Sequence, residues 1–304
     1  MKTFSCFLVI LTLAIYAPAQ NNPSFSQYMG IERKFNPASI NLSNTIDFSI
    51  VARQQWVGFE DAPSTQIFNA STYIHDIFGG VGLNIINDQL GHEHNLSVRG
   101  NYSFPVQVGV LSHLVFGLGF GFVSRTIDGT QLIYDDPNDP AAILHSETFL
   151  KPDFSFGIEL IDPNFRVGGS IHHLYRSLNN AGIEFTPRHY NFYGSYRFHD
   201  VWPDLTLEPY VLVRTNMHIM QVDVSLLAHY NDRIWGGISL RFGDALSAIV
   251  GYAITENIRI GYSYDYSIGV NRRYSGGSHE IMISTSLPGF NRTRIRPNTP
   301  RLFN

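Results

Sequence analysis

Apolar and polar residues alternate strictly along many stretches of this chain. Between 95 and 104 the even positions hold Leu, Val, Gly, Tyr and Phe, while the odd positions hold Asn, Ser and Arg. Between 258 and 267 Ile and Tyr alternate with Arg, Gly, Ser and Asp. Between 116 and 122 Phe and Leu alternate with Gly117, Gly119 and Gly121. A period of two places successive side chains on opposite faces, so each stretch predicts a β-strand with one apolar face.

About fourteen such segments follow one another. They are 45–53, 64–73, 80–87, 94–104, 113–125, 151–160, 165–174, 189–198, 206–217, 219–229, 234–242, 245–255, 258–267 and 279–287. The long connections, 54–63, 126–150, 175–188 and 268–278, all follow odd-numbered segments. An even strand count with short turns at one end and long loops at the other is typical of outer-membrane barrels.

The second face of these segments distinguishes a membrane barrel from a soluble sandwich. It carries Gly, Ser, Asn and scattered charge rather than many Lys and Glu, which favours a polar lumen. The sequence therefore predicts an all-β fold, a transmembrane antiparallel β-barrel of about 14 strands over residues 45–287. Its apolar faces are expected to contact the lipid bilayer of the cell outer membrane.

Both ends of the chain lie outside this pattern. Residues 1–20 read as a signal peptide, with Lys2, an apolar run from Phe4 to Ile15 and a small-residue cleavage pattern at 17–19. Residues 21–44, rich in Asn, Ser and Pro, are expected to form a periplasmic or lumenal segment. Residues 288–304 are expected to form a basic periplasmic tail, with partner contacts at Arg292, Arg294 and Arg296.

Composition narrows the choice of function. Charged residues are 15% of the chain, below the roughly 25% usual in soluble domains, and aromatics reach 13%. The net charge of −4 gives no reason to expect a nucleic acid partner. The only cysteine, Cys6, falls in the signal peptide, which excludes disulfides and thiolate chemistry from the mature chain.

Several blocks of residues, most of them in the first third of the chain, form a recognisable pattern. They are Pro23-Ser24-Phe25-Ser26-Gln27-Tyr28-Met29, Asn36-Pro37-Ala38, Arg53-Gln54-Gln55-Trp56-Val57-Gly58-Phe59, Ala62-Pro63-Ser64-Thr65-Gln66, Gly79-Gly80-Val81-Gly82-Leu83, Asn87-Asp88 and Gly91, with Lys151-Pro152-Asp153-Phe154-Ser155-Phe156-Gly157 further along. In these residues the chain resembles the PorP/SprF family of outer-membrane proteins of the type IX secretion and gliding apparatus of the Bacteroidetes. This resemblance implies a barrel that works with the translocon, with partners that include other type IX components and a secreted surface protein or adhesin.

The block that ends the first predicted strand is the main candidate site. The predicted partner-binding residues are Arg53, Gln55, Trp56, Phe59 and Pro63, because Trp and Arg are favoured at binding hot spots. The alternative is structural, with Trp56 at the membrane interface and Arg53 in an ion pair within the lumen.

Other chemical signals are weaker. Gly117, Gly119 and Gly121 lie inside a strand, so they favour a close approach of backbone in the lumen over phosphate binding. His172 and His173 are adjacent in a predicted strand and are expected to face opposite sides. Inward charges are expected to pair across a plugged lumen or to line a pore; they are Arg99, Glu159, Asp223, Arg241, Arg259 and Asp265.

Three functional hypotheses follow. The first is an interaction protein that helps to secrete, capture or anchor a type IX surface protein. The second is a porin or transporter for small solutes, and the third a barrel lipid hydrolase. No catalytic, cofactor-binding or metal-binding residues are predicted, and the chain is not expected to be an enzyme.

Overall fold

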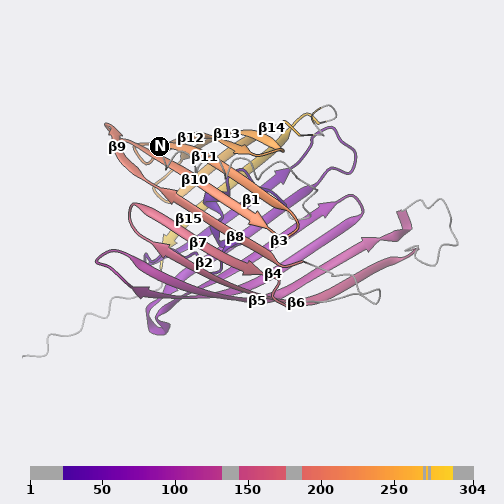
Figure 1. Ribbon diagram of the computed structural model, residues 1–304, viewed down its shortest axis with the longest axis horizontal. Coiled ribbons are helices and arrows are strands. Elements are labelled where there is room, and N and C mark those ends of the chain that lie inside the picture. Colours follow the sequence, from indigo (N-terminus) through magenta and orange to yellow (C-terminus); the bar gives the residue numbers. More distant parts are fainter. Residues whose placement is uncertain (1–22, 132–143, 176–186, 270–271, 273–274, 290–304) are drawn as a thin grey trace, which may run out of the picture.

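The computed structural model describes residues 23–131, 144–175, 187–269, 272 and 275–289 (Figure 1). Antiparallel strands dominate this part of the chain. The strands are β1 (Thr45–Gln54), β2 (Ser64–Ile74), β3 (Gly79–Leu90), β4 (Glu93–Gln107), β5 (His113–Asp128), β6 (Ser146–Ile161), β7 (Phe165–His172), β8 (His189–Tyr196), β9 (Phe198–Trp202), β10 (Leu205–Thr215), β11 (Met220–Tyr230), β12 (Ile234–Arg241), β13 (Ala245–Ala253), β14 (Ile258–Ser267) and β15 (Ser278–Pro288). Short helical turns are η1 (Tyr28–Gly30), α2 (Glu32–Phe35), η2 (His75–Ile77) and η3 (Gly129–Gln131).

Fourteen strands close into a barrel. Consecutive strands pair with one another except β8 and β9, β1 pairs with β15, and β10 pairs with both β8 and β11. The fifteenth strand, β9, continues β8 after an interruption at Arg197 and pairs with β10 through a shifted register. The predicted fold class, a 14-stranded antiparallel transmembrane barrel, is therefore confirmed. A closed sheet has no free edge along its circumference, so backbone hydrogen bonding can be satisfied within the sheet.

Large apolar side chains cover the outside of the barrel. Phe120 on β5 is 63% exposed and Ile238 on β12 is 60% exposed, and exposed and buried positions alternate along β13 from end to end. Most of the buried polar side chains of the wall are Ser, Asn, Asp, Glu and Arg. This is the outward-apolar, inward-polar arrangement of barrels that sit in a bilayer. Within the described residues, no helix has the length and apolar character needed to span a membrane.

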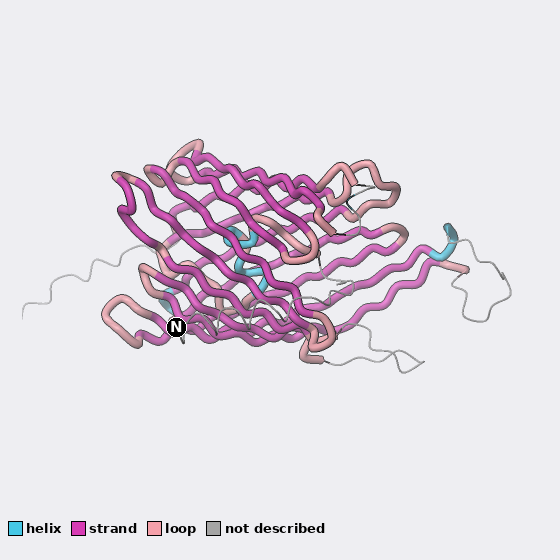
Figure 2. The backbone as a smooth tube through the Cα atoms, turned by 45° about the horizontal axis from the view of Figure 1, so that its top comes forward, coloured by secondary structure: helices cyan, strands magenta, loops and turns pink. Residues whose placement is uncertain are grey.

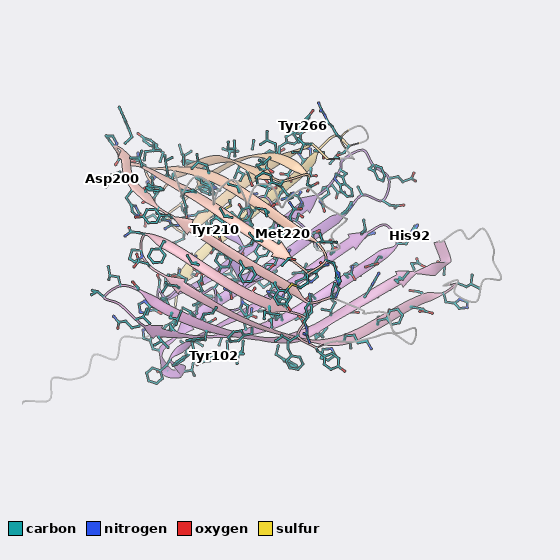
Figure 3. The ribbon with its side chains drawn as sticks, in the orientation of Figure 1. His92, Tyr102, Asp200, Tyr210, Met220 and Tyr266 are labelled. Carbon is teal, nitrogen blue, oxygen red and sulfur yellow. The ribbon has the colours of Figure 1, made fainter. Side chains whose placement is uncertain are left out.

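The two ends of the barrel differ. At one end, here called the loop end, the connections include 55–63, 129–145, 173–188 and 268–277. At the other, the turn end, all connections are short, and none is longer than 108–112. Figure 3 shows His92 at the loop end and Asp200 at the turn end. The predicted connection 126–150 is too long at both ends. Strands β5 and β6 remain paired as far as the pair Asp128–Ser146, which lies beyond the part of each strand where apolar and polar residues alternate.

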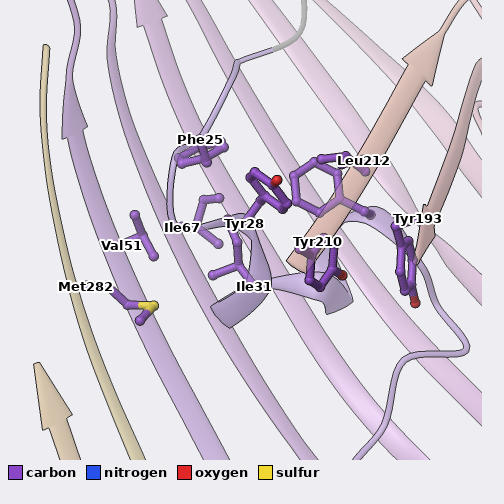
Figure 4. Close-up of a cluster of buried hydrophobic side chains, with 10 residues drawn as sticks. Phe25, Tyr28, Ile31, Val51, Ile67, Tyr193, Tyr210, Leu212 and Met282 are labelled. Carbon is purple, nitrogen blue, oxygen red and sulfur yellow. The ribbon is translucent and has the colours of Figure 1, made fainter. Parts of the chain in front are cut away.

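Residues 23–40, here called the plug, lie inside the barrel. The short helical turns η1 and α2 occupy its middle, as Figure 2 shows. Phe25, Tyr28, Ile31 and Phe35 of the plug are all at most 5% exposed. They pack against inward side chains of the wall, which are Val51, Ile67, Tyr193, Tyr210, Leu212 and Met282 (Figure 4). The hydrophobic core of this membrane protein is thus the contact between plug and lumen.

Candidate functional site: the plugged lumen

A buried ionic cluster holds the start of the plug. The guanidinium of Arg53 on β1 donates to Asp265 on β14 at 2.6 Å and to Glu280 on β15 at 3.0 Å. All three side chains are at most 1% exposed. The backbone N–H groups of Ser26 and Gln27 donate to the two carboxylate oxygens of Glu280 at 3.0 and 2.9 Å. Glu280 therefore serves both as the counter-ion of Arg53 and as the acceptor that fixes the plug backbone.

The cluster continues around the wall. Arg241 on β12 contacts Asp223 on β11 at 3.3 Å, and Arg214 on β10 contacts the same carboxylate at 3.0 Å. Arg214 also donates to the carbonyl oxygen of Pro23 at 3.5 Å. Tyr28 of the plug shares a hydrogen bond of 2.6 Å with the hydroxyl of Ser225 on β11. Side chains from six strands thus converge on the first turn of the plug.

A second cluster holds the helical turn α2. Arg166 on β7 contacts Glu32 of the plug at 2.7 Å and Glu159 on β6 at 3.1 Å. The hydroxyl of Tyr193 on β8 donates to Glu159 at 2.9 Å, and that of Tyr210 on β10 donates to Glu32 at 3.2 Å. One arginine thus bridges plug and wall, while two buried tyrosines satisfy the carboxylates.

The carbonyl oxygen of Phe35 marks the end of α2. It accepts hydrogen bonds from Ser170, from His172 Nε2 at 2.6 Å and from Asn191 at 3.1 Å. The next residue, Asn36, donates to the hydroxyl of Tyr193 at 3.1 Å. A carbonyl at a helix end lacks an intrahelical partner, and here side chains from β7 and β8 supply one.

Inward glycines make room for the plug backbone. A Cβ added at Gly117 on β5 would overlap the backbone of Pro37 and Ala38, and one added at Gly157 on β6 would overlap Asn36. A Cβ at Gly80 on β3 would overlap the side chain of Ile40. The expectation that lumenal glycines mark a close approach of backbone is confirmed for Gly117.

Two cavities lie on opposite sides of the plug. The loop-end cavity, of about 150 Å³, is lined by Pro23, Lys34 and Phe35 of the plug and by wall residues of β3, β4, β5, β7 and β8. The turn-end cavity, of about 760 Å³, is lined by Gln27, Met29, Gly30 and Glu32 of the plug and by residues near the opposite strand ends. These two cavities share no lining residue. Different plug residues therefore line each cavity.

The structure spreads the predicted partner-binding residues over two environments. Arg53 is 2% exposed and belongs to the interior ionic cluster, as the structural alternative expected. Gln55 and Trp56 are half-buried in the 55–63 loop, Phe59 is 52% exposed, and Pro63 is buried.

The 55–63 loop is hydrogen-bonded to the end of the 268–277 connection. The N–H of Val57 donates to the carbonyl of Gly277 at 2.8 Å, and the N–H of Gly276 donates back to Val57 at the same distance. Trp56 has a left-handed backbone, with φ of 44°. Arg292, Arg294 and Arg296, the predicted tail contacts, lie outside the described residues.

The predicted inward charges are paired, with one exception. Arg99, Glu159, Asp223, Arg241 and Asp265 all take part in buried ion pairs within the lumen. Arg259 instead is exposed and lines the turn-end cavity.

The prediction that His172 and His173 face opposite sides is wrong. Strand β7 ends at His172, and His173 takes a left-handed φ of 57°, which turns its ring back into the loop-end cavity. There it contacts Asp153 at 3.0 Å. Even so, the described residues contain no group of three or more His, Cys, Asp or Glu side chains placed to hold a metal ion.

Sequence reasoning gave no structural role to the plug residues that contact the wall, although Ser26 and Asn36 were among the residues that match the family. Ser26, Glu32, Lys34 and Asn36 belong to a short segment without a period, so no strand or helix pattern singled them out. The available signal was compositional, since Glu-Arg-Lys at 32–34 is a charged run directly before Phe35 and an Asn-Pro pair.

Solved outer-membrane proteins share the fold. The toluene transporter TbuX of Ralstonia pickettii aligns over 84% of this chain and 92% of its own, with a TM-score of 0.50 and 14% identity. Omp33 of Acinetobacter baumannii aligns over 81% of this chain and 99% of its own, with a TM-score of 0.47 and 8% identity. At such low identity these likenesses concern the fold alone. No curated protein matches the sequence significantly.

The family comparison is more specific than these structural likenesses. The family described as "Type IX secretion system membrane protein PorP/SprF" matches residues 17–285, which span both the plug and the barrel strands. The match extends far beyond the first third of the chain in which the sequence resemblance was most evident. This chain therefore belongs to the PorP/SprF family of type IX secretion system membrane proteins, as an outer-membrane β-barrel.

Proposed function

We propose that this protein helps to secrete, capture or anchor a surface protein of the type IX pathway, such as an adhesin, through its loop end. In outer-membrane barrels the longer loops face the outside and the short turns face the periplasm. Membership of the PorP/SprF family supports a role beside the translocon. The secreted partner and the other type IX components that it would contact are part of this proposal.

The observation that carries the proposal is the plug. Side chains from most of the wall strands bond to residues 23–40, and the two cavities on either side of the plug share no lining residue. A general diffusion pore needs a continuous aqueous path through its lumen. A filled lumen instead leaves the loop end as a rigid platform for protein contacts, with Phe59 and Trp56 on its 55–63 loop.

The test compares two phenylalanines of equal exposure at opposite ends. Phe59 at the loop end is 52% exposed and Phe198 at the turn end is 51% exposed. Phe59→Ala and Phe198→Ala are introduced separately into the native host, and surface display of secreted adhesins is quantified by protease accessibility and flow cytometry. The proposal expects lower surface display with Phe59→Ala, and co-purification of the adhesin with the unmodified barrel but not with that variant.

The alternatives give different results. Solute uptake by the purified barrel in liposomes, with normal display in a strain that lacks it, would replace the proposal with a porin. Lipid turnover by the purified barrel would favour the hydrolase. Equal display for the two phenylalanine variants would remove the 55–63 loop from the proposed contact surface.

A further inference from the structure

Among the described residues, Lys34 is a buried cation that makes no direct ion pair. Its side chain belongs to α2 in the plug and is 4% exposed. Its ammonium donates to the carbonyl oxygen of Pro23 at 2.9 Å and lies 4.3 Å from the ring centre of Phe25 and 4.9 Å from that of Phe35. Within the described residues no carboxylate lies within 4.0 Å of it.

Two arginines lie in the surroundings of Lys34. Arg214 donates to the same carbonyl of Pro23, so two cations share one neutral acceptor. Arg99 lines the same cavity and contacts Asp153 only at 3.9 Å. The cavity wall also holds two carboxylates: Asp88 accepts a hydrogen bond from Thr65 at 2.6 Å, and Glu93 pairs with Arg125 at 2.5 Å. Other ionic residues of the plug, Glu32 and Arg33, each have an opposite charge on the wall.

Such an arrangement is costly unless an anion completes it. Burying an ammonium with incomplete pairing costs free energy, and aromatic faces and one carbonyl offset only part of that cost. Lys34 borders the loop-end cavity of about 150 Å³, which has room for a carboxylate group and a few water molecules. Arg99 and the histidine ring of His189 line the same space and supply further donors.

From this geometry we infer that the loop-end cavity binds a carboxylate, with the ammonium of Lys34 as its principal partner. The carboxylate can come from a free small acid or from the C-terminus of a peptide that enters from the loop end. The inference stands on the cavity alone and does not depend on the proposed secretion role.

Lysine content makes a direct test possible. The chain has three lysines, Lys2, Lys34 and Lys151, so protein labelled with ¹³C at the lysine ε position gives very few signals. Lys151→Met assigns the spectrum and serves as a matched control, because Lys151 on β6 does not line the cavity. The full chain in detergent is titrated with sodium acetate, with acetylated penta-alanine as the free acid and with the same peptide as the amide, all against sodium chloride at equal ionic strength.

The expected result is a saturable shift of the Lys34 signal with acetate, with the free-acid peptide, or with both. Saturation by acetate identifies a site for small acids, and saturation by the free-acid peptide alone identifies a site for chain ends. Lys34→Met should weaken binding, followed by calorimetry, about tenfold or more, whereas Lys151→Met should leave it unchanged. If Lys34→Met does not fold, Lys34→Arg, which keeps the charge, replaces it in the binding measurement.

Two outcomes would overturn the inference. One is a Lys34 signal that responds to acetate and the free-acid peptide no more than to chloride. The other is an equal response to the free-acid and amide peptides, which would show that the carboxylate is not what the cavity recognises.

Discussion

Replacing Arg53 with Met tests whether the interior ionic cluster stabilises the plugged barrel. The change keeps most of the aliphatic stem and removes the guanidinium that contacts Asp265 at 2.6 Å and Glu280 at 3.0 Å. Because all three side chains are at most 1% exposed, water cannot replace the lost cation. Removing one partner of a buried ion pair costs about 3–5 kcal/mol.

The remaining contacts place the expected cost at the lower end of that range. Asp265 keeps Arg241 at 3.5 Å, and Glu280 keeps two backbone N–H donors from the plug. We therefore expect a loss of about 3 kcal/mol in the free energy of unfolding, or roughly a hundredfold in the ratio of folded to unfolded protein. The double variant Arg53→Met/Glu280→Gln should recover about 1 kcal/mol, since it also removes a stranded charge.

The assay is urea unfolding of the barrel in phospholipid vesicles, followed by the fluorescence of its three tryptophans. Arg259→Met is the matched control, because Arg259 on β14 is exposed and should change the stability by less than about 0.5 kcal/mol. A loss below about 1 kcal/mol for Arg53→Met, or a double variant no more stable than the single one, would refute the reasoning that this cluster is desolvated and charged.

Three further substitutions probe the plug and the lipid face. Gly117→Leu should displace the plug, because the new side chain overlaps the backbone of residues 37 and 38, and should raise conductance in planar bilayers, whereas Gly194→Leu, with only ordinary contacts around its Cβ, should not. Tyr193→Phe leaves Glu159 and Asn36 without a shared hydroxyl and should lower the free energy of unfolding by about 1–2 kcal/mol in the same urea assay. Phe120→Arg puts a charge on the outer face and should cost about 2–4 kcal/mol in vesicles, with a much smaller effect in detergent as the check.

The barrel could be predicted from the sequence because lipid imposes a rule on every strand. Residues that face the bilayer must be apolar and their neighbours face the lumen, so the period of two is visible without any knowledge of the contacts. Where a strand leaves the bilayer the rule no longer applies. The predicted loop 126–150 therefore began too early and ended too late. The continuation of β8 as β9 beyond Arg197 was not predicted either.

The site was less predictable than the fold, because it consists of contacts between residues far apart in the chain. Ser26 meets Asp265 and Glu280, and Glu32 meets Arg166, at separations that no local pattern encodes. The predicted Arg53 block was a useful signal, but the sequence could not choose between a partner contact and a lumenal ion pair. The direction of the His173 side chain depends on its own left-handed backbone just after the end of β7, which no sequence pattern indicates.

The order of charges in the plug explains why it has one position in the lumen. Glu32 faces Arg166, Arg33 faces Asp47 and the backbone at Ser26 faces Glu280, so donors and acceptors of the plug match those of the wall residue by residue. A displacement by one residue would bring Arg33 towards Arg166 and leave Glu32 buried without its cation. Because unpaired buried charges are costly, such a shift is strongly disfavoured. Lys34 departs from this matching, and its proposed partner is therefore a carboxylate in the loop-end cavity rather than a residue of the wall.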